Sequence, residues 1–216
     1  MLVVRDLHKS FGELSVLEGI NIFIERGKVY TLTGGNGSGK TTLFNLISGF
    51  VRPTRGAILL NGSDIVGLSP YKINRLGIGR TFQDLRLAMG LSVRENVLLA
   101  MEKKIFEKFD SLRNGKVNEI LARMSLLEKA DSLAGEISYG QQKLLTLACL
   151  IANNAELMLI DEPVAGIDKV NFCKVAELVK ELRKEGKAVV QIEHHYDYIA
   201  QTSDCVFKME NGKIVC

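Results

Sequence analysis

The sequence predicts a mixed α/β fold in which helices pack against a largely parallel sheet. A glycine-rich segment at residues 34–39 follows a short apolar run and precedes a helical pattern, which is the order strand, loop, helix. Residues 157–160 and 188–193 form largely apolar runs of strand length, as strands buried on both faces of a parallel sheet do. A helical pattern at 169–184 separates these two runs, which is the alternation that such folds require.

The composition describes an ordinary globular protein of 216 residues, with 46% hydrophobic and 25% charged residues. A net charge of +3 without a lysine or arginine block argues against nucleic acid as a partner. We find no signal-peptide pattern and no apolar run of the roughly 18 residues that span a membrane. The cysteines lie far apart, so we expect reduced, mostly buried thiols of a cytosolic protein rather than a metal or redox site. They are Cys149, Cys173, Cys205 and Cys216.

The first thirty residues predict antiparallel strands, because apolar residues alternate at 2–4 and at 16–24. Phe11 falls in the turn between these two segments. Its ring either belongs to the core or stacks on a purine, and the residues around it leave both interpretations open.

A phosphate-binding loop follows a buried strand predicted at 29–33. The segment GGNGSGKTT matches G-x-x-x-x-G-K-[ST], whose glycines let successive backbone N–H groups converge on an anion. Lys40 adds a charge that reaches the terminal phosphates, and the hydroxyl of Thr41 is a ligand for Mg²⁺. The apolar residues that follow are spaced as in a helix, whose N-terminus also favours phosphate. We therefore predict nucleotide binding by Gly34, Gly35, Asn36, Gly37, Ser38, Gly39, Lys40, Thr41 and Thr42.

Beyond the loop helix the sequence first continues the sheet. A strand at 56–62 ends in an Asn-Gly turn, and a short helix opens at Ser69-Pro70 with proline in its first position. Another strand at 77–82 leads directly to Gln83.

A helical insertion comes next. Ser92 and Glu95 form a capping box that begins a helix to about residue 109. Asn114-Gly115 is expected to interrupt the pattern before a second helix at about 116–127. With the helix that follows, the insertion covers about residues 87–153.

Ser138 and Gly140 stand where that last helix begins, and it runs to about Asn153. They serve either as an ordinary helix cap or as a helix N-terminus aimed at a phosphate.

Two carboxylates, Asp161 and Glu162, end the buried strand at 157–160. The carboxyl ends of parallel strands face the crevice where such sheets bind ligands. Adjacent side chains point in different directions, so one is placed to hold Mg²⁺ and the other to act on a water molecule. A solvated acidic turn is the alternative, which the upstream phosphate loop disfavours.

The strand at 188–193 ends in His194-His195, which is either a polar loop or a contact for a γ-phosphate. A metal site is not expected, because adjacent residues point apart and no third ligand is evident. A final hairpin joins 205–210 to 213–216 through a turn at Asn211-Gly212.

These motifs, in this order and over essentially the whole chain, resemble the ATPase subunit of ABC transporters. GGNGSGKTT is similar to Walker A, and LMLIDEP to Walker B, with Asp161 as the Mg²⁺ carboxylate and Glu162 as the catalytic glutamate. TFQD resembles the Q-loop with Gln83, AGID the D-loop ending at Asp168, and IEH the switch motif with His194. ISYGQQ resembles the ABC signature, which other P-loop ATPases lack.

The resemblance implies a single domain over 1–216, with a P-loop NTPase (RecA-like) core, an N-terminal antiparallel β subdomain and an inserted α-helical subdomain. It implies ATP and Mg²⁺ as cofactors, with Gln83 beside Thr41 and Asp161 at the metal. It implies that two subunits close around ATP and dock on transmembrane permease subunits at the cytoplasmic face of a membrane. Further residues implied to contact the nucleotide are Phe11, Val16, Ser138, Gly140, Gln141 and Asp168.

Within the family, the stretches RTFQDLRL, SVRENV, SYGQQ and IEHH look most like importers of branched-chain amino acids and similar polar solutes. Gly35, Cys149 and His195 depart from the usual pattern without removing a catalytic side chain. One rival function is a soluble ABC-type ATPase of DNA repair or translation, which the absence of long coiled coils or a second cassette disfavours. The other is a regulatory nucleotide-binding module, which the presence of Glu162, Gln83 and His194 together disfavours.

Overall fold

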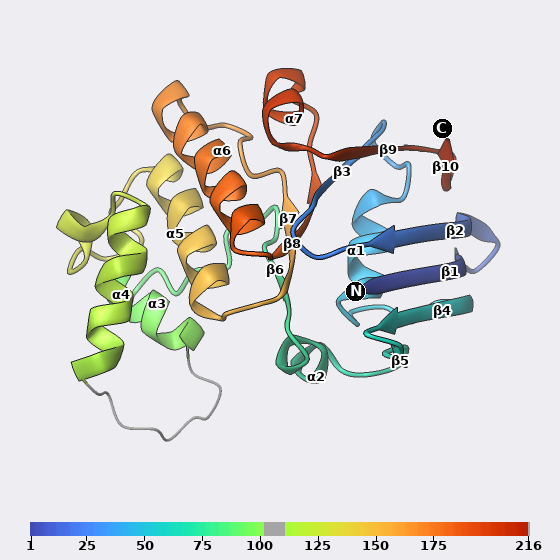
Figure 1. Cartoon of the computed structure of the whole chain (residues 1–216), viewed down its shortest axis with the longest axis horizontal. Helices are drawn as coiled ribbons and strands as arrows, with labels where there is room; N and C mark the ends of the chain where they lie inside the picture. Colours follow the sequence, from blue (N-terminus) through green and yellow to red (C-terminus); the bar gives the residue numbers. More distant parts are fainter. Residues whose placement is uncertain (102–110, 216) are drawn as a thin grey trace.

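The computed structural model describes residues 1–101 and 111–215. In this part of the chain, helices cover one face of a six-stranded sheet, and a four-stranded antiparallel sheet lies on the other side (Figure 1). The predicted α/β class is therefore confirmed. Within these residues no helix combines the length and apolar character needed to cross a bilayer.

The antiparallel sheet has the strand order β2-β1-β4-β5. Its strands are β1 (Leu2–Phe11), β2 (Leu14–Ile24), β4 (Arg55–Leu60) and β5 (Ser63–Asp64). The two N-terminal strands are longer than predicted, since their pairing continues to the turn beside Phe11. The expected turn at Asn61-Gly62 is confirmed, and both residues adopt the positive φ that such a turn requires.

The larger sheet has the order β10-β9-β3-β8-β7-β6, and only β10 runs antiparallel to its neighbour. Its strands are β3 (Val29–Thr33), β6 (Ile78–Arg80), β7 (Leu157–Asp161), β8 (Ala188–Ile192), β9 (Cys205–Glu210) and β10 (Lys213–Val215). Every residue of β7 and β8 is buried, as their largely apolar sequences predicted.

Two cores meet at this sheet. On β7, Leu157 and Leu159 pack into the core beneath the antiparallel sheet, while Met158 and Ile160 pack into the core beneath the helices. Side chains alternate between the faces of a strand, so a strand with a core on each side is apolar on both faces.

The helices on the covered face are α5 (Tyr139–Ala152), α6 (Lys169–Lys184) and α7 (Tyr196–Thr202), whose buried residues share one core. Helices α1 (Lys40–Ile47) and α2 (Pro70–Arg75) pack into the other core, with the antiparallel sheet (Figure 1). The predicted start of α2 is confirmed, because Pro70 is its first residue and Ser69 caps it by accepting a hydrogen bond from the backbone N–H of Lys72. Helix α7 was not expected. Its two turns are anchored by the fully buried Tyr198, whose neighbours in sequence are mostly polar and gave no helical periodicity.

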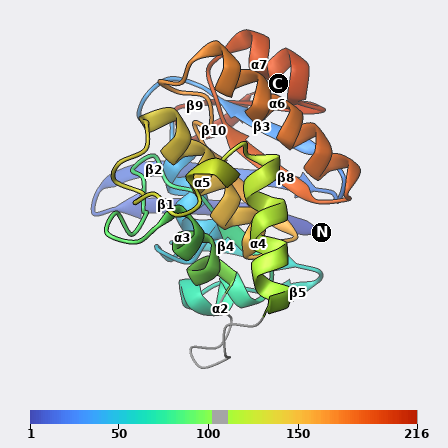
Figure 2. The ribbon, with the colours of Figure 1, turned by 90° about the vertical axis from the view of Figure 1, so that its left-hand side faces the viewer.

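Between β6 and β7 lie α3 (Val93–Met101), α4 (Ser111–Arg123) and the short 3-10 helix η1 (Leu127–Lys129), which Figure 2 shows grouped beside α5. The capping box of Ser92 and Glu95 is present. The predicted end of this first helix, near residue 109, lies outside the described residues.

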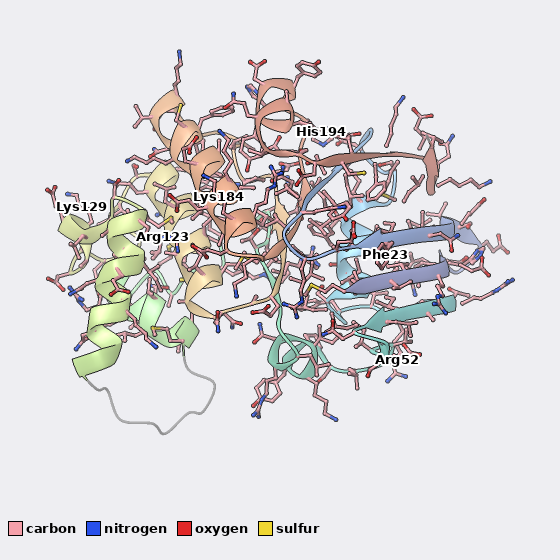
Figure 3. The ribbon with its side chains drawn as sticks, viewed as in Figure 1. Phe23, Arg52, Arg123, Lys129, Lys184 and His194 are labelled. Atoms are coloured by element: carbon pink, nitrogen blue, oxygen red, sulfur yellow. The ribbon has the colours of Figure 1, made fainter. Side chains whose placement is uncertain are left out.

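The expected interruption at Asn114-Gly115 is wrong, because α4 runs through both residues. A glycine inside a helix costs about 1 kcal/mol relative to alanine, and buried packing readily offsets that. Here Val117 and Leu121 are fully buried. Arg123, labelled in Figure 3, also ties the end of α4 to Glu181 and Glu185 on α6 through ion pairs of 3.0 and 2.9 Å.

The expectation of mostly buried cysteines is also wrong. Cys173 is exposed on α6, and Cys149 and Cys205 are only half-buried, while Cys216 lies outside the described residues. All three described cysteines are free thiols. Burial raises the pKa of Cys149 to about 12, so this thiol stays protonated at neutral pH.

Candidate nucleotide site

A cavity of about 530 Å³ lies where β3, β7 and β8 end, beside the glycine-rich loop. Segments from five parts of the chain converge on it, as expected at the carboxyl edge of a parallel sheet. It is lined by Leu14, Val16, Asn36, Gly37, Ser38, Gly39, Lys40, Thr41, Thr42, Gln83, Asp161, Glu162, Ile192 and His194. Most of the residues predicted from the sequence are therefore brought together, while Leu14 and Ile192 were missed.

The loop requires glycine at two positions. Gly34 and Gly39 have φ values of 138° and 103°, and a Cβ atom at either would collide with Met209 or Leu17. Lys40 is 7% exposed, and its Nζ donates hydrogen bonds to the carbonyl oxygens of Gly34 (2.7 Å) and Gly35 (2.9 Å). Burial lowers the pKa of Lys40, and the nearby carboxylates of Glu162 and Asp161 partly oppose this shift. The lysine is thus held along the loop, with its ammonium group at the cavity.

Asp161, the last residue of β7, is 6% exposed. Burial raises the pKa of its carboxyl group, although the Arg80 guanidinium, 3.7 Å away, acts in the opposite direction. Arg80 is itself buried on β6, which lowers its pKa to about 10, and its Nε has no hydrogen-bond partner among the residues that the structure describes. Its Nη1 donates to Asn45 (2.7 Å) and Ser48 (3.1 Å) on α1. Arg80 therefore connects the Asp161 carboxylate to the helix that follows the phosphate loop.

Glu162 adopts a left-handed backbone conformation, with φ of 47°. Such a conformation costs a non-glycine residue about 1–3 kcal/mol and persists only where neighbours hold it. Its N–H donates to the carbonyl of Ile192 (3.0 Å), and its own carbonyl accepts from Lys143 Nζ (2.9 Å). Its carboxylate lies 3.5 Å from the Gln83 side-chain nitrogen. The Glu162 side chain is thereby placed at the cavity rather than in a solvated turn.

The oxygen-bearing side chains at the cavity fit Mg²⁺. Thr41, Gln83 and Asp161 supply a hydroxyl, an amide carbonyl and a carboxylate, and Mg²⁺ in nucleotide sites is bound by one or two carboxylates together with phosphates and water. Among the described residues no group of three His, Cys, Asp or Glu side chains is close enough to hold a metal by itself. The donor set thus suits an ion that arrives with a phosphate ligand.

The two histidines after β8 point in different directions, as predicted. His194 lines the nucleotide cavity, whereas His195 packs on Phe172 with ring centroids 5.0 Å apart. His195 also lines a separate cavity of about 620 Å³ between α6 and α7. Only His194 is therefore in position to reach a nucleotide in this cavity.

Comparison with protein families decides what kind of site this is. Residues 17–165, more than half of the chain, match the family described as ABC transporter. The chain belongs to the ABC transporter family.

Two relatives illustrate the range within this family. The chain is 35% identical to the probable branched-chain amino acid transport ATP-binding protein of Archaeoglobus fulgidus, over 100% of this chain and 88% of that protein. It is 34% identical to the xylose/arabinose import ATP-binding protein of Sulfolobus acidocaldarius, over 100% of this chain and 86% of that protein.

Solved structures confirm the ABC ATPase fold. A nucleotide-free ATP-binding cassette from an ABC transporter matches with a TM-score of 0.90 and 31% identity, over 100% of this chain and 90% of that one. A dimeric cassette in a post-hydrolysis state, bound to ADP and phosphate, matches with a TM-score of 0.90 and 26% identity, over 100% of this chain and 97% of that one. An ATP-binding site and ATP hydrolysis are accordingly what this family membership establishes for the chain.

The residues that resemble the family's signature lie outside the cavity of their own subunit. Ser138 caps α5 by accepting from the N–H of Gln141 (3.3 Å), and the side-chain oxygen of Gln141 accepts from the N–H of Ser138 (3.0 Å). The expected cap is confirmed. Gly140, in the first turn, packs against Asn171 of α6. Nucleotide contact by these three residues stays a prediction.

Two further predicted contacts also lie outside this cavity. Asp168 caps α6 by accepting from the N–H groups of Val170 (2.9 Å) and Asn171 (3.0 Å), and these hydrogen bonds lower its pKa. Phe11 is 50% exposed at the tip of the β1–β2 hairpin, where Lys9 Nζ lies 4.5 Å from its ring centroid. Phe11 is therefore not a core residue, and its stacking on adenine stays a prediction.

Proposed function

We propose that this chain is the ATP-hydrolysing subunit of an importer of branched-chain amino acids or similar polar solutes, acting at the cytoplasmic face of a membrane. The observation that carries the proposal is the convergence of Glu162, His194 and the Lys40 loop on one cavity at the sheet edge. The two relatives described above are named for amino acid and for sugar import. Their likeness supports import, and the sequence stretches quoted earlier favour the amino acid branch.

Each side chain at the cavity has a distinct role in this proposal. Lys40 and the loop N–H groups bind the terminal phosphates, and Thr41, Asp161 and Gln83 hold Mg²⁺, which supplies charge neutralisation at the phosphates. Glu162 polarises the attacking water molecule. His194 stabilises the charge that develops on the transferred phosphoryl group.

A second ATPase subunit completes the site. Ser138 and Asp168 are exposed and lie outside the cavity of their own subunit, so they are free to cover ATP held by a partner copy together with Gly140 and Gln141. Closing two copies around two ATP molecules excludes water and strengthens each phosphate contact. The helical subdomain of about 87–153 is the surface that we assign to the transmembrane permease subunits.

The test is to tag the chain in its native cell, isolate membranes under mild conditions and identify the proteins that co-purify. Recovery with polytopic membrane proteins would support the transporter subunit, and a second ATPase in the complex would distinguish a heterodimer from a homodimer. Recovery only in the soluble fraction, with ribosomes or DNA or alone, would overturn the transport proposal and favour the rival functions. Phosphate release from ATP by the purified chain tests hydrolysis separately.

A further inference from the structure

Glu193 is a buried carboxylate at the edge of the nucleotide site, and none of the roles above uses it. It follows β8 directly, precedes His194, and is only 4% exposed. It does not line the nucleotide cavity. An ionisable side chain with so little exposure is rarely retained unless its oxygens are well partnered, so its contacts indicate what it does.

Three backbone N–H groups donate to this carboxylate. One oxygen, Oε2, accepts from His194 (2.6 Å) and from His195 (3.0 Å). The other, Oε1, accepts from Val164 (3.2 Å), which lies two residues after Glu162. A single side chain thus bridges the loop that carries His194 and the loop that carries Glu162.

This bridge begins where the sheet stops holding the two loops together. Strands β7 and β8 are paired up to Asp161 and Ile192, and the last backbone hydrogen bond between them runs from the N–H of Glu162 to the carbonyl of Ile192. The next backbone N–H of the second segment, that of Glu193, donates instead to the carbonyl of Leu32 on β3 (3.3 Å). Because Glu162 is held at a positive φ, the segment after it needs an anchor, and the hydrogen bond from Val164 supplies one.

We propose that Glu193 is a positioning residue for ATP hydrolysis, which fixes the spacing between the Glu162 loop and the His194 loop. With that spacing set, the side chains that act on the water molecule and on the phosphoryl group face the same point. A displacement of about 1 Å at such a site lowers the rate by roughly a hundredfold. The inference rests on the proposed function, since it assigns Glu193 to the same reaction.

The chemistry of the bridge requires a carboxylate. Both oxygens of Glu193 act as acceptors, one for each loop, whereas glutamine offers one acceptor oxygen and one donor nitrogen. In Glu193→Gln, at least one loop therefore faces an N–H group instead of an acceptor. The substitution keeps the volume and the apolar contacts of the side chain.

The first test compares the steady-state kinetics of Glu193→Gln with those of a matched control, Gln191→Met. Gln191 is fully buried on the same strand and bonds to Thr31, Thr202 and Tyr198, so the control disturbs the core beside β8 without touching either loop. We expect Glu193→Gln to lower kcat at least about tenfold while KM for ATP stays within about threefold, because the phosphate loop is unchanged. Gln191→Met should keep kcat within about twofold at a temperature where both variants are folded.

The second test follows amide hydrogen exchange and does not depend on turnover. In Glu193→Gln, exchange should rise at Val164 or at the His194-His195 pair, and in Glu193→Ala it should rise at both. Gln191→Met should leave exchange at these amides unchanged.

The outcomes separate the two ideas. Three results would overturn the positioning role: a kcat of Glu193→Gln equal to that of the unchanged chain, an equal loss of kcat in Gln191→Met, or unchanged exchange at both loops. In each of these cases, turnover by the unchanged chain would still uphold the ATPase. Absence of turnover in the wild-type chain would instead overturn the proposed function, and the catalytic role of Glu193 with it.

Discussion

The Nζ of Lys143 lies 2.9 Å from the backbone carbonyl oxygen of Glu162, and Lys143 is only 6% exposed. Helix α5, which begins with the signature-like Ser138, is thereby attached to the segment that carries the proposed general base. Burial lowers the pKa of Lys143, an effect that the carboxylates of Glu162 and Asp161 oppose. A buried ammonium group thus holds the backbone at Glu162 from one side.

Replacing this donor should slow hydrolysis more than it weakens ATP binding. A hydrogen bond from a charged group contributes about 1.5–3 kcal/mol, and if about 1.4 kcal/mol is lost from the transition state, the rate falls tenfold. We expect Lys143→Met to lower kcat roughly tenfold with little change in KM. Lys180→Met is the control, since Lys180 lies on α6 and pairs with Glu177 at the surface. Equal kcat in the two variants would contradict this assignment.

Glu162→Gln should retain ATP binding, lose most turnover and accumulate as an ATP-bound dimer. The amide keeps the shape of the side chain but is a poor acceptor for a proton from the attacking water. Turnover is measured as phosphate release, and the dimer by size-exclusion chromatography in ATP. A turnover rate equal to that of the wild-type chain would exclude Glu162 as the general base.

Asp161→Asn should stabilise the nucleotide-free protein while reducing its response to Mg²⁺ and ATP. The pKa of Asp161 is raised in the fold, so the folded protein binds that proton more tightly than the unfolded chain does. Stability from this group is therefore full at low pH and is lost as the pH rises through the folded pKa. Asparagine mimics the protonated form and keeps an oxygen toward Arg80.

We expect Tm without ligand to rise by about 2–4 °C, the shift that about 1 kcal/mol produces in a chain of this size. The measurement is thermal unfolding at neutral pH with and without Mg²⁺ and ATP. A lower Tm in the ligand-free variant would contradict this. It would show that losing the attraction between the Asp161 carboxylate and Arg80 costs more stability than removing a buried charge gains.

Phe11→Ala should weaken ATP binding if the ring stacks on adenine. Stacking of a base on an aromatic side chain contributes about 1–3 kcal/mol, so Kd should rise roughly fivefold or more. Phe23→Ala is the matched control, because Phe23 is similarly exposed (55%) but lies at the far end of the same sheet (Figure 3). Both Kd values are measured by calorimetric titration. An unchanged Kd for Phe11→Ala would show that its ring does not stack on adenine, and would favour Val16 and Leu14 as the residues that contact the base.

Much of the site could be predicted from the sequence because its motifs are local. The phosphate loop requires glycine where the backbone turns left-handed, and the carboxylates follow a run of residues that only a doubly buried strand accommodates. Strand, loop and helix at 29–47 are therefore correctly anticipated, as is the placement of Asp161 and Glu162 at the sheet edge. The parallel arrangement then brings His194 to the same edge.

The misassignments arise where tertiary packing overrides a local signal. Asn114-Gly115 reads as a turn, yet the buried contacts of Val117 and Leu121 carry α4 through it. Helix α7 is short and polar in sequence, and only the burial of Tyr198 against its neighbours defines it.

The sequence by itself determined which residues bind phosphate, which carboxylates follow the central strand and which family the chain resembles. Only the tertiary structure decided how the charged side chains around that site are used. In the sequence, Arg80, Lys143 and Glu193 are ordinary charged residues within a strand, a helix and a strand end. Their roles depend on burial and on which backbone groups lie opposite them. Those partners come from segments distant in the chain, as Asp161 is from Arg80, and no local periodicity records such a pairing.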